Sequence, residues 1–130
     1  MAIKFDYDLA LNLKARDIIN KLEMKHVKTD RLVCMRSRGS DARRTIARCY
    51  GLGKMWQKAL GTKAWYIIEV ISEHFDRLSE EDQDKTIIHE LLHIPNSFGG
   101  GFRHHSNWVT ELRVNELYKK YIIEKTKEDL

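Results

Sequence analysis

The sequence has a single proline, only two cysteines and no apolar run that approaches the length of a membrane span. The cysteines, Cys34 and Cys49, form no CxxC pair and are too few for a disulfide framework. The amino-terminal stretch carries Asp6 and Asp8 and has no signal-peptide core. We therefore expect a cytoplasmic protein, in which reducing conditions leave both cysteines as buried free thiols.

Internal repeats and low-complexity linkers are absent as well. The 130 residues suit one domain better than two, and a hydrophobic content of 42% is typical of a globular protein. We expect a single α+β domain that spans residues 1–130.

Neither sign of charge dominates, because the formal net charge is only +4. Basic residues do gather in one short region, and such a cluster can contact the phosphates of a nucleic acid. No aromatic residues alternate with the arginines there, so a solvated hairpin is the better interpretation and a nucleic-acid partner the secondary one. The arginines concerned are Arg36, Arg38, Arg43, Arg44 and Arg48.

Two segments in the first half have the composition of strands. They cover residues 31–38 and 45–51, and the turn-forming residues 39–43 between them predict a hairpin. That hairpin would place Cys34 roughly opposite Cys49. A disulfide between these cross-strand neighbours is a further hypothesis.

The remaining segments alternate between helical and extended patterns. Residues 6–25 have the spacing of an amphipathic helix that packs on a sheet, and residues 64–71 are rich in aromatic and β-branched residues typical of a strand. Residues 53–61 fit a short helix or an irregular strand. A final helix is expected over residues 107–125, and its expected buried residues are Val109, Leu112, Leu117 and Tyr121.

The stretch HELLHIP, residues 89–95, carries the chemistry. A capping signature precedes it, because Ser79 can cap a helix and Asp82 follows three residues later. Pro95 ends the helix directly after the motif. The motif is therefore expected on a helix with a defined start and a defined end.

On a helical wheel of about 100° per residue, His89 and His93 lie only about 40° apart. Two imidazoles at this spacing can reach one Zn²⁺, while Glu90 flanks them and is placed to take a proton from a water molecule. The opposite arc is apolar, which fixes the helix to a core. It holds Ile87, Ile88, Leu91, Leu92 and Ile94.

A catalytic zinc site needs a third protein ligand and an open position. The three glycines at 99–101 can turn the chain back, and His104 and His105 follow, of which only one need bind. A helix with surface histidines is the alternative, but it leaves the proline stop and the downstream histidines unexplained. A structural zinc site would give Glu90 no task and has no cysteine ligand.

Three stretches carry a resemblance to a known family: RSRGSDARRTIARCYGLGKMWQ, AWYIIEVI and IHELLHIPNSFGGGFRHH. Together they resemble the minimal zincin metallopeptidases of the archaeal and phage type, which form the selecase-like phage metallopeptidase family. The resemblance covers about residues 31–121. It implies a minimal zincin-like α+β domain. In such a domain a small twisted sheet packs on an amino-terminal helix and on the HExxH helix, and a carboxy-terminal helix completes the fold.

In that family a basic residue, a variable residue and a histidine follow the glycine-rich loop, and here these are Arg103, His104 and His105. The resemblance therefore implies His105 as the third ligand. Other zincins take a glutamate from the next helix, and Glu111 or Glu116 could serve here. The order of preference for the third ligand is His105, His104 and Glu116. His104 or Arg103 is also a candidate for stabilising an oxyanion.

We expect from these residues a zinc endopeptidase with one Zn²⁺ per chain, in which Glu90 acts as general base on a peptide or unfolded protein substrate. By resemblance to zincins, the substrate lies extended along the strand before the site helix. Two alternatives are a zinc-dependent binding or regulatory module that does not need Glu90, and a DNA-associated Sprt-like protease that uses the arginine cluster.

Overall fold

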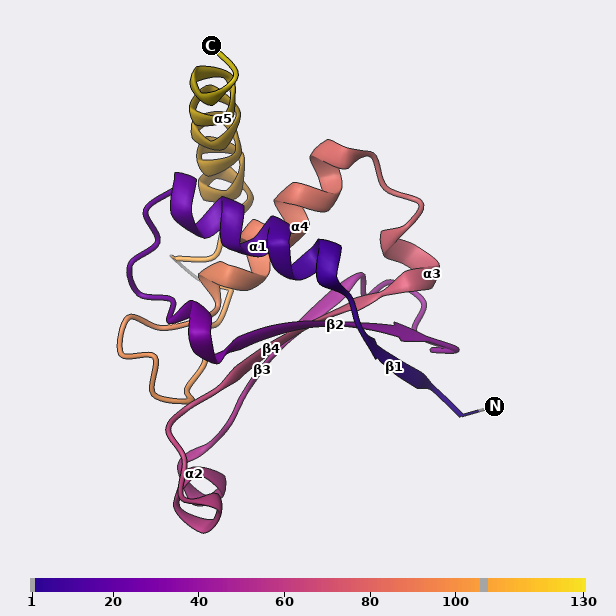
Figure 1. Ribbon diagram of the computed structural model, residues 1–130. Helices are drawn as coiled ribbons and strands as arrows, with labels where there is room; N and C mark the ends of the chain where they lie inside the picture. The colour runs from indigo at the N-terminus through magenta and orange to yellow at the C-terminus, as the bar shows by residue number, and fades with distance from the viewer. Residues whose placement is uncertain (1, 106–107) are drawn as a thin grey trace.

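A mixed four-stranded sheet forms one layer of the protein, and most of the helices pack on one of its faces (Figure 1). The computed structural model describes residues 2–105 and 108–130. The expected α+β fold is confirmed. The elements are β1 (Lys4–Tyr7), α1 (Leu9–Lys21), the 3-10 helix η1 (Thr29–Arg31), β2 (Leu32–Arg38), β3 (Ala47–Gly51), α2 (Lys54–Leu60), β4 (Tyr66–Ile71), α3 (Ser72–Phe75), α4 (Glu80–Leu92) and α5 (Glu111–Glu128).

The strand order is β1-β2-β4-β3, with β2 and β4 parallel and the outer pairs antiparallel. The predicted hairpin is therefore wrong, because β4 lies between β2 and β3. Cys34 and Cys49 each pair with Ile68 from opposite sides, and both are free thiols. The physical reason is that β4 is the most apolar strand, and a strand buried on both faces belongs in the middle of a sheet.

The amino-terminal prediction also needs a correction. Residues 6 and 7 belong to β1, which pairs antiparallel with β2, and the helix ends at Lys21 and not at residue 25. Asp8 is the N-cap of α1, since its carboxylate accepts a hydrogen bond from the Leu11 amide at 3.0 Å. A cap at this position leaves the preceding residues extended and available to the sheet.

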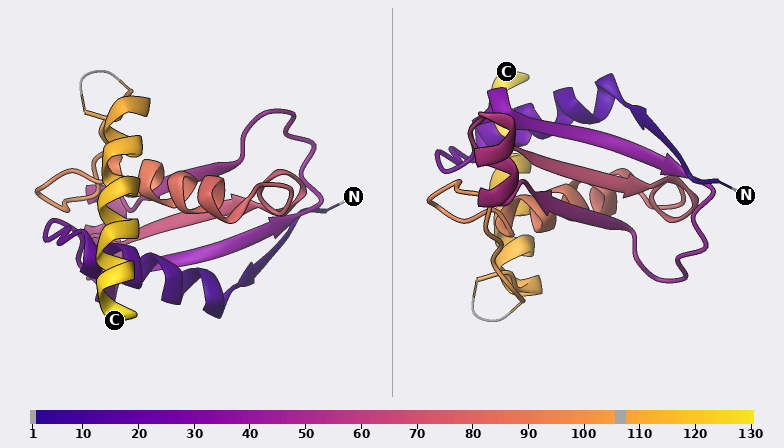
Figure 2. Two further views of the ribbon diagram at one scale, coloured as in Figure 1. Left: turned by 90° about the horizontal axis from the view of Figure 1, so that it is seen from above. Right: turned by 90° about the horizontal axis from the view of Figure 1, so that it is seen from below.

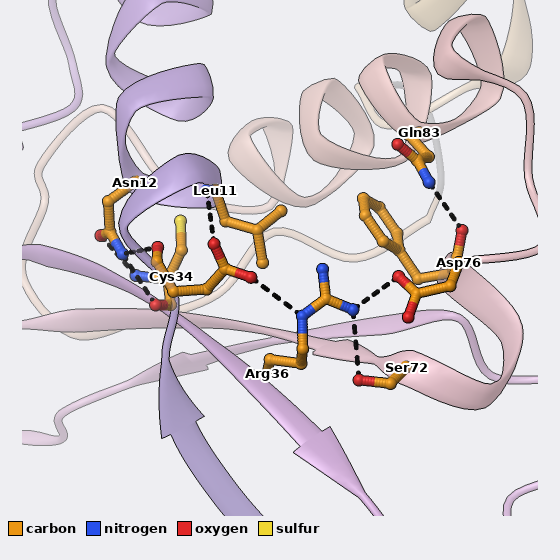
Figure 3. Close-up of polar contacts among 9 residues, drawn as sticks. Leu11, Asn12, Cys34, Arg36, Ser72, Asp76 and Gln83 are labelled. Carbon is orange, nitrogen blue, oxygen red and sulfur yellow. Dashed lines mark hydrogen bonds and ion pairs between the residues drawn. The ribbon is translucent and has the colours of Figure 1, made fainter.

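The helices α1 and α4 cover the same face of the sheet, and α5 crosses them (Figures 1 and 2). The apolar core lies between these helices and the sheet, with Ile18, Ile68 and Ile88 fully buried. Asn12 ties α1 to β2, because its side chain both donates to the Cys34 carbonyl at 2.9 Å and accepts from the Cys34 amide at 2.8 Å (Figure 3). The site helix α4 thus rests on a fixed layer.

The carboxy-terminal helix α5 begins at Glu111, after the N-cap Thr110. The predicted start at Asn107 lies outside the described residues. Val114 and Tyr121, seven residues apart, face inward, so Leu112 lies on the opposite side and is 70% exposed, contrary to the prediction. Within the described chain, no helix combines the length and the apolar character that a membrane crossing requires.

Arg36 connects β2 with the start of α1 and with the segment after β4 (Figure 3). Its guanidinium donates to Asp8 at 2.9 Å, to Asp76 at 2.6 Å and to Ser72 at 3.2 Å. Burial alone would raise the pKa of Asp8, but the Leu11 amide and Arg36 outweigh it and lower that pKa. Arg36 is thus a structural arginine inside the basic cluster.

Replacing Arg36 with Met should lower the free energy of unfolding by about 2 kcal/mol near neutral pH, because Asp8 loses its half-buried ion-pair partner. Folding lowers the pKa of this carboxyl group, so the group stabilises the folded protein at any pH above its pKa in the unfolded chain. This stabilisation is lost as the pH falls through the pKa that the group has in the folded protein. The difference between wild type and Arg36→Met should therefore shrink below about pH 4 in urea unfolding. Arg38→Met, an exposed arginine of the same strand, is the control; an equal loss there would contradict the assignment.

Candidate metal centre

The helix α4 presents its motif as the sequence predicts. Ser79 caps it by accepting a hydrogen bond from the Asp82 amide at 3.2 Å, and the helix ends at Leu92. The apolar back of the helix is fully buried, so α4 cannot rotate without exposing the core. The buried residues on this side are Ile87, Ile88, Leu91, Leu92 and Ile94, each 3% exposed or less.

Three imidazoles converge beside the carboxy-terminal end of α4. The Nε2 atom of His89 lies 2.8 Å from Nε2 of His105 and 3.2 Å from Nε2 of His93. The ligand atoms of the three residues all lie within 4.8 Å of one another, which makes them the one such group found in the described part of the chain. The motif and the segment after the glycine loop therefore meet at one point.

The protonation of these rings suits a metal ligand. Burial and the neighbouring rings lower the pKa of His89 to about 4, and burial also lowers the pKa of His93. Both rings are then neutral at pH 7, the form that binds metals. Two nitrogens about 2.0–2.1 Å from one tetrahedral ion lie roughly 3.3 Å apart, close to the separations found here. The three residues therefore fit a metal ion of the size of zinc.

A backbone contact orients His93. Its Nδ1 atom bonds the carbonyl of Arg103, and the Arg103 amide donates to the His93 carbonyl at 2.7 Å. Donation from Nδ1 leaves the lone pair on Nε2, which faces the other two histidines. The ring of Phe102 stacks on His93 with centroids 4.4 Å apart. The segment that carries the third histidine thus also fixes the second.

Glu90 is buried beside the three histidines. It is 7% exposed, and one carboxylate oxygen lies 3.9 Å from Nε2 of His89. Burial raises its pKa to about 7. A carboxyl group in this position can hold or release a proton near neutral pH, which is the property required of an acid–base group.

The three histidines and Glu90 line a cleft of about 980 Å³. One wall comes from β3 and the residues before it, and the other from α4 and the first turn of α5. Because β3 is an edge strand of the sheet, one side of its backbone faces away from β4. Further lining residues are Arg44, Arg48, Leu78, Asp82, Thr86, Val109, Glu111 and Val114.

The glycine loop is held against the sheet by its backbone. A Cβ atom on Gly51 would lie 2.6 Å from the Gly100 carbonyl oxygen, so the two glycines allow an approach that no other residue permits. Gly100 also has a φ of 101°, which favours glycine. The buried Tyr66 hydroxyl accepts from the Gly100 amide at 2.9 Å and donates to the Gly101 carbonyl at 2.7 Å. Tyr66 and Gly51 therefore fix the path towards His105.

The structure separates the candidates for the third ligand. His105 lies with His89 and His93, whereas His104 is exposed and its ring lies 5.5 Å from that of Phe102. Glu116 is exposed on α5 and is not part of the group of metal-ligating side chains found among the described residues. The geometry thus brings together the first-ranked set.

The remaining predicted residues lie elsewhere. The guanidinium of Arg103 stacks over Trp108 at 4.4 Å, and neither Arg103 nor His104 is among the residues that line the cleft. Of the basic cluster, Arg44 and Arg48 line the cleft while Arg36 is held in ion pairs. Arg38 and Arg43 are exposed and do not line the cleft, so the arginines are divided among structural, cleft and surface positions.

Sequence reasoning missed Tyr66, Gln57 and Gly51, which hold the glycine loop. Gln57 donates from Nε2 to the carbonyls of Leu52 at 2.7 Å and Gly99 at 3.0 Å. The one sequence signal was Gly51 at the end of a predicted strand, since glycine in a strand often marks a close backbone approach. Nothing in the local pattern indicated which segment would approach it.

The family model described as "Putative phage metallopeptidase" matches residues 5–129, nearly the whole chain. No curated protein and no solved structure matches the chain.

Substitution of single histidines should separate the candidate ligands. His105→Ala should weaken zinc binding by more than about 100-fold, because one of three converging nitrogens is removed. Loss of a residue that only supports a ligand through a hydrogen bond usually weakens metal binding by about 10–100-fold. His104→Ala should bind zinc as wild type does. Competition with a zinc-sensitive dye measures both affinities, and equal retention in the two variants would contradict the ligand set.

Tyr66→Phe tests the support of the loop. Loss of the hydroxyl releases Gly100 and Gly101, so zinc affinity should fall by about 10-fold and the absorption spectrum of the cobalt-substituted protein should change. Tyr121→Phe is a matched control, because Tyr121 is also fully buried and, among the described residues, its hydroxyl donates to Asp17 and not to the glycine loop. If both variants kept wild-type zinc affinity, Tyr66 would have no role in positioning His105.

Proposed function

The chain belongs to the phage metallopeptidase family, and on this premise we propose that it is a zinc-dependent endopeptidase that cleaves unfolded polypeptides. The observation that carries the proposal is the convergence of three imidazoles beside a buried carboxyl group in an open cleft. This combination provides a metal site and an acid–base group at one place, which a purely structural site does not need.

His89, His93 and His105 would hold the zinc ion. When bound there, zinc would supply a Lewis acid that polarises the scissile carbonyl group and lowers the pKa of a water molecule. The contribution of the chain is to bring the three rings together and to keep His89 and His93 neutral. Burial lowers the pKa of His89 and His93, and the Arg103 carbonyl fixes the tautomer of His93.

Glu90 is the proposed general base. Its carboxylate lies inside the cleft, next to His89 and not among the three converging nitrogens. From this position it takes a proton from the attacking water and passes it to the nitrogen of the leaving amine, which breaks the peptide bond. Its burial excludes bulk water from the carboxyl group.

The substrate is proposed to lie along β3. The strand before the site helix, β4, cannot accept it, because β4 is paired on both sides by β2 and β3. The edge strand β3 lines the cleft and can add one more extended chain through backbone hydrogen bonds. Such pairing needs an extended substrate and makes few demands on its sequence, which favours unfolded protein over folded protein.

Glu90→Gln should abolish turnover and leave the metal in place. The amide keeps the size of the side chain but cannot accept the proton, so cleavage of an unfolded protein should fall by about 10²–10⁴-fold. Zinc content and melting temperature should remain close to wild type. Glu111→Gln, which also lines the cleft, is the matched control and should retain activity.

Chelation should abolish wild-type cleavage and added zinc should restore it. If Glu90→Gln cleaved as fast as wild type, or if the zinc-loaded wild type cleaved no unfolded substrate, the protein would instead be a metal-dependent binding module.

A further inference from the structure

The short helix α2 has an apolar side that no other part of the described chain covers. Met55 is 85% exposed, Trp56 63% and Leu60 62%, and Gln57 is the only residue of the helix that is not exposed. On a helical wheel these three residues and Ala59 share an arc of about 140°, and Gln57 lies outside it. Side chains of this size rarely gather on a monomer surface without a partner.

The charges around this apolar side all have one sign. Lys54, Lys58 and Lys63 are exposed, and residues 52–65 contain no acidic residue. None of the ion pairs formed among the described residues involves these lysines. A partner that is both apolar and acidic would complement this surface.

The position of α2 links it to the cleft. Only Leu52 and Gly53 separate it from the edge strand β3, and Gln57 fastens it to the glycine loop through the Gly99 carbonyl. Figure 1 shows α2 beyond the ends of β3 and β4, on the side away from α1, α4 and α5. A chain that pairs with β3 and continues past Gly51 therefore runs onto α2.

We propose that α2 is a second contact for the polypeptide substrate, which recognises an apolar and acidic segment flanking the cleavage site. This inference rests on the proposed function. An extended chain advances about 3.3 Å per residue, and α2 is about 10 Å long, so the flanking segment comes within roughly six residues of the part paired with β3.

Two weak contacts on one chain reinforce each other. Once the substrate pairs with β3, its flanking segment is held near α2 at a high effective concentration. The exposed helix need not bind a free peptide tightly to increase the affinity for a long substrate. The surface would thus favour long unfolded chains over short peptides.

The test measures binding of labelled peptides to the zinc-loaded Glu90→Gln protein by fluorescence anisotropy. A six-residue peptide that spans β3 is compared with peptides extended by ten residues on either side, with flanks containing Leu and Asp or Leu and Lys. We expect the Leu–Asp flank, on one side only, to tighten binding by about 10-fold or more. The Leu–Lys flank should give a smaller gain.

The triple substitution Met55→Ser, Trp56→Ser and Leu60→Ser should remove this gain and leave binding of the short peptide and zinc content unchanged. The matched control replaces Leu9, Leu13 and Leu112 with Ser, since these are exposed to a similar degree on α1 and α5. A second variant, Lys54→Glu with Lys58→Glu, keeps the apolar side and should invert the preference between the acidic and basic flanks.

The outcomes separate this inference from the proposed function. If zinc-loaded wild type cleaves the short peptide but neither flank tightens binding, or the triple variant keeps the gain, α2 is not a substrate contact and the peptidase assignment stands. Binding of wild type and the triple variant to phosphatidylserine vesicles is measured in parallel. If the triple variant loses vesicle binding but keeps the gain from the Leu–Asp flank, α2 is a membrane contact and the proposal is overturned. If the wild type cleaves neither short nor long peptides, both proposals fail.

Discussion

The close approach of Gly51 and Gly100 is the contact on which the candidate metal centre depends. It joins the last residue of the cleft strand β3 to the loop that leads to the third histidine. A Cβ atom at Gly51 would lie 2.6 Å from the Gly100 carbonyl oxygen, so any side chain there would displace the loop that leads to His105. The same loop bonds Gln57 and Tyr66, so the sheet, α2 and the metal site share one support.

Low exposure to water sets the chemistry of the site. Burial lowers the pKa of His89 to about 4 and raises the pKa of Glu90 to about 7, and both shifts favour the uncharged form. The result is a neutral His89 ring, with a nitrogen lone pair available for a metal, beside a carboxyl group that exchanges its proton near neutral pH. The helix α4 makes this possible, because its buried apolar back fixes the polar front at the wall of the cleft.

Local patterns predicted α4 well and the sheet poorly. The capping serine, the apolar spacing and Pro95 each act within a few residues, so the start, face and end of the helix follow from them. Strand partners are chosen over long sequence separations, which periodicity does not encode. The pattern therefore predicted a β2–β3 hairpin, whereas the apolar β4 occupies the centre, and it extended the first helix into the last two residues of β1.

For the site, the sequence by itself determined the pair His89 and His93 with Glu90 beside them, because helix geometry places residues four apart on one face. The resemblance to a family added His105, but only the fold placed its ring near the pair while leaving His104 outside the group of converging nitrogens. Which strand lines the cleft was also decided by tertiary structure. The reason is physical: a helical face is set by local backbone geometry, whereas an edge strand and a returning loop are set by what packs beside them.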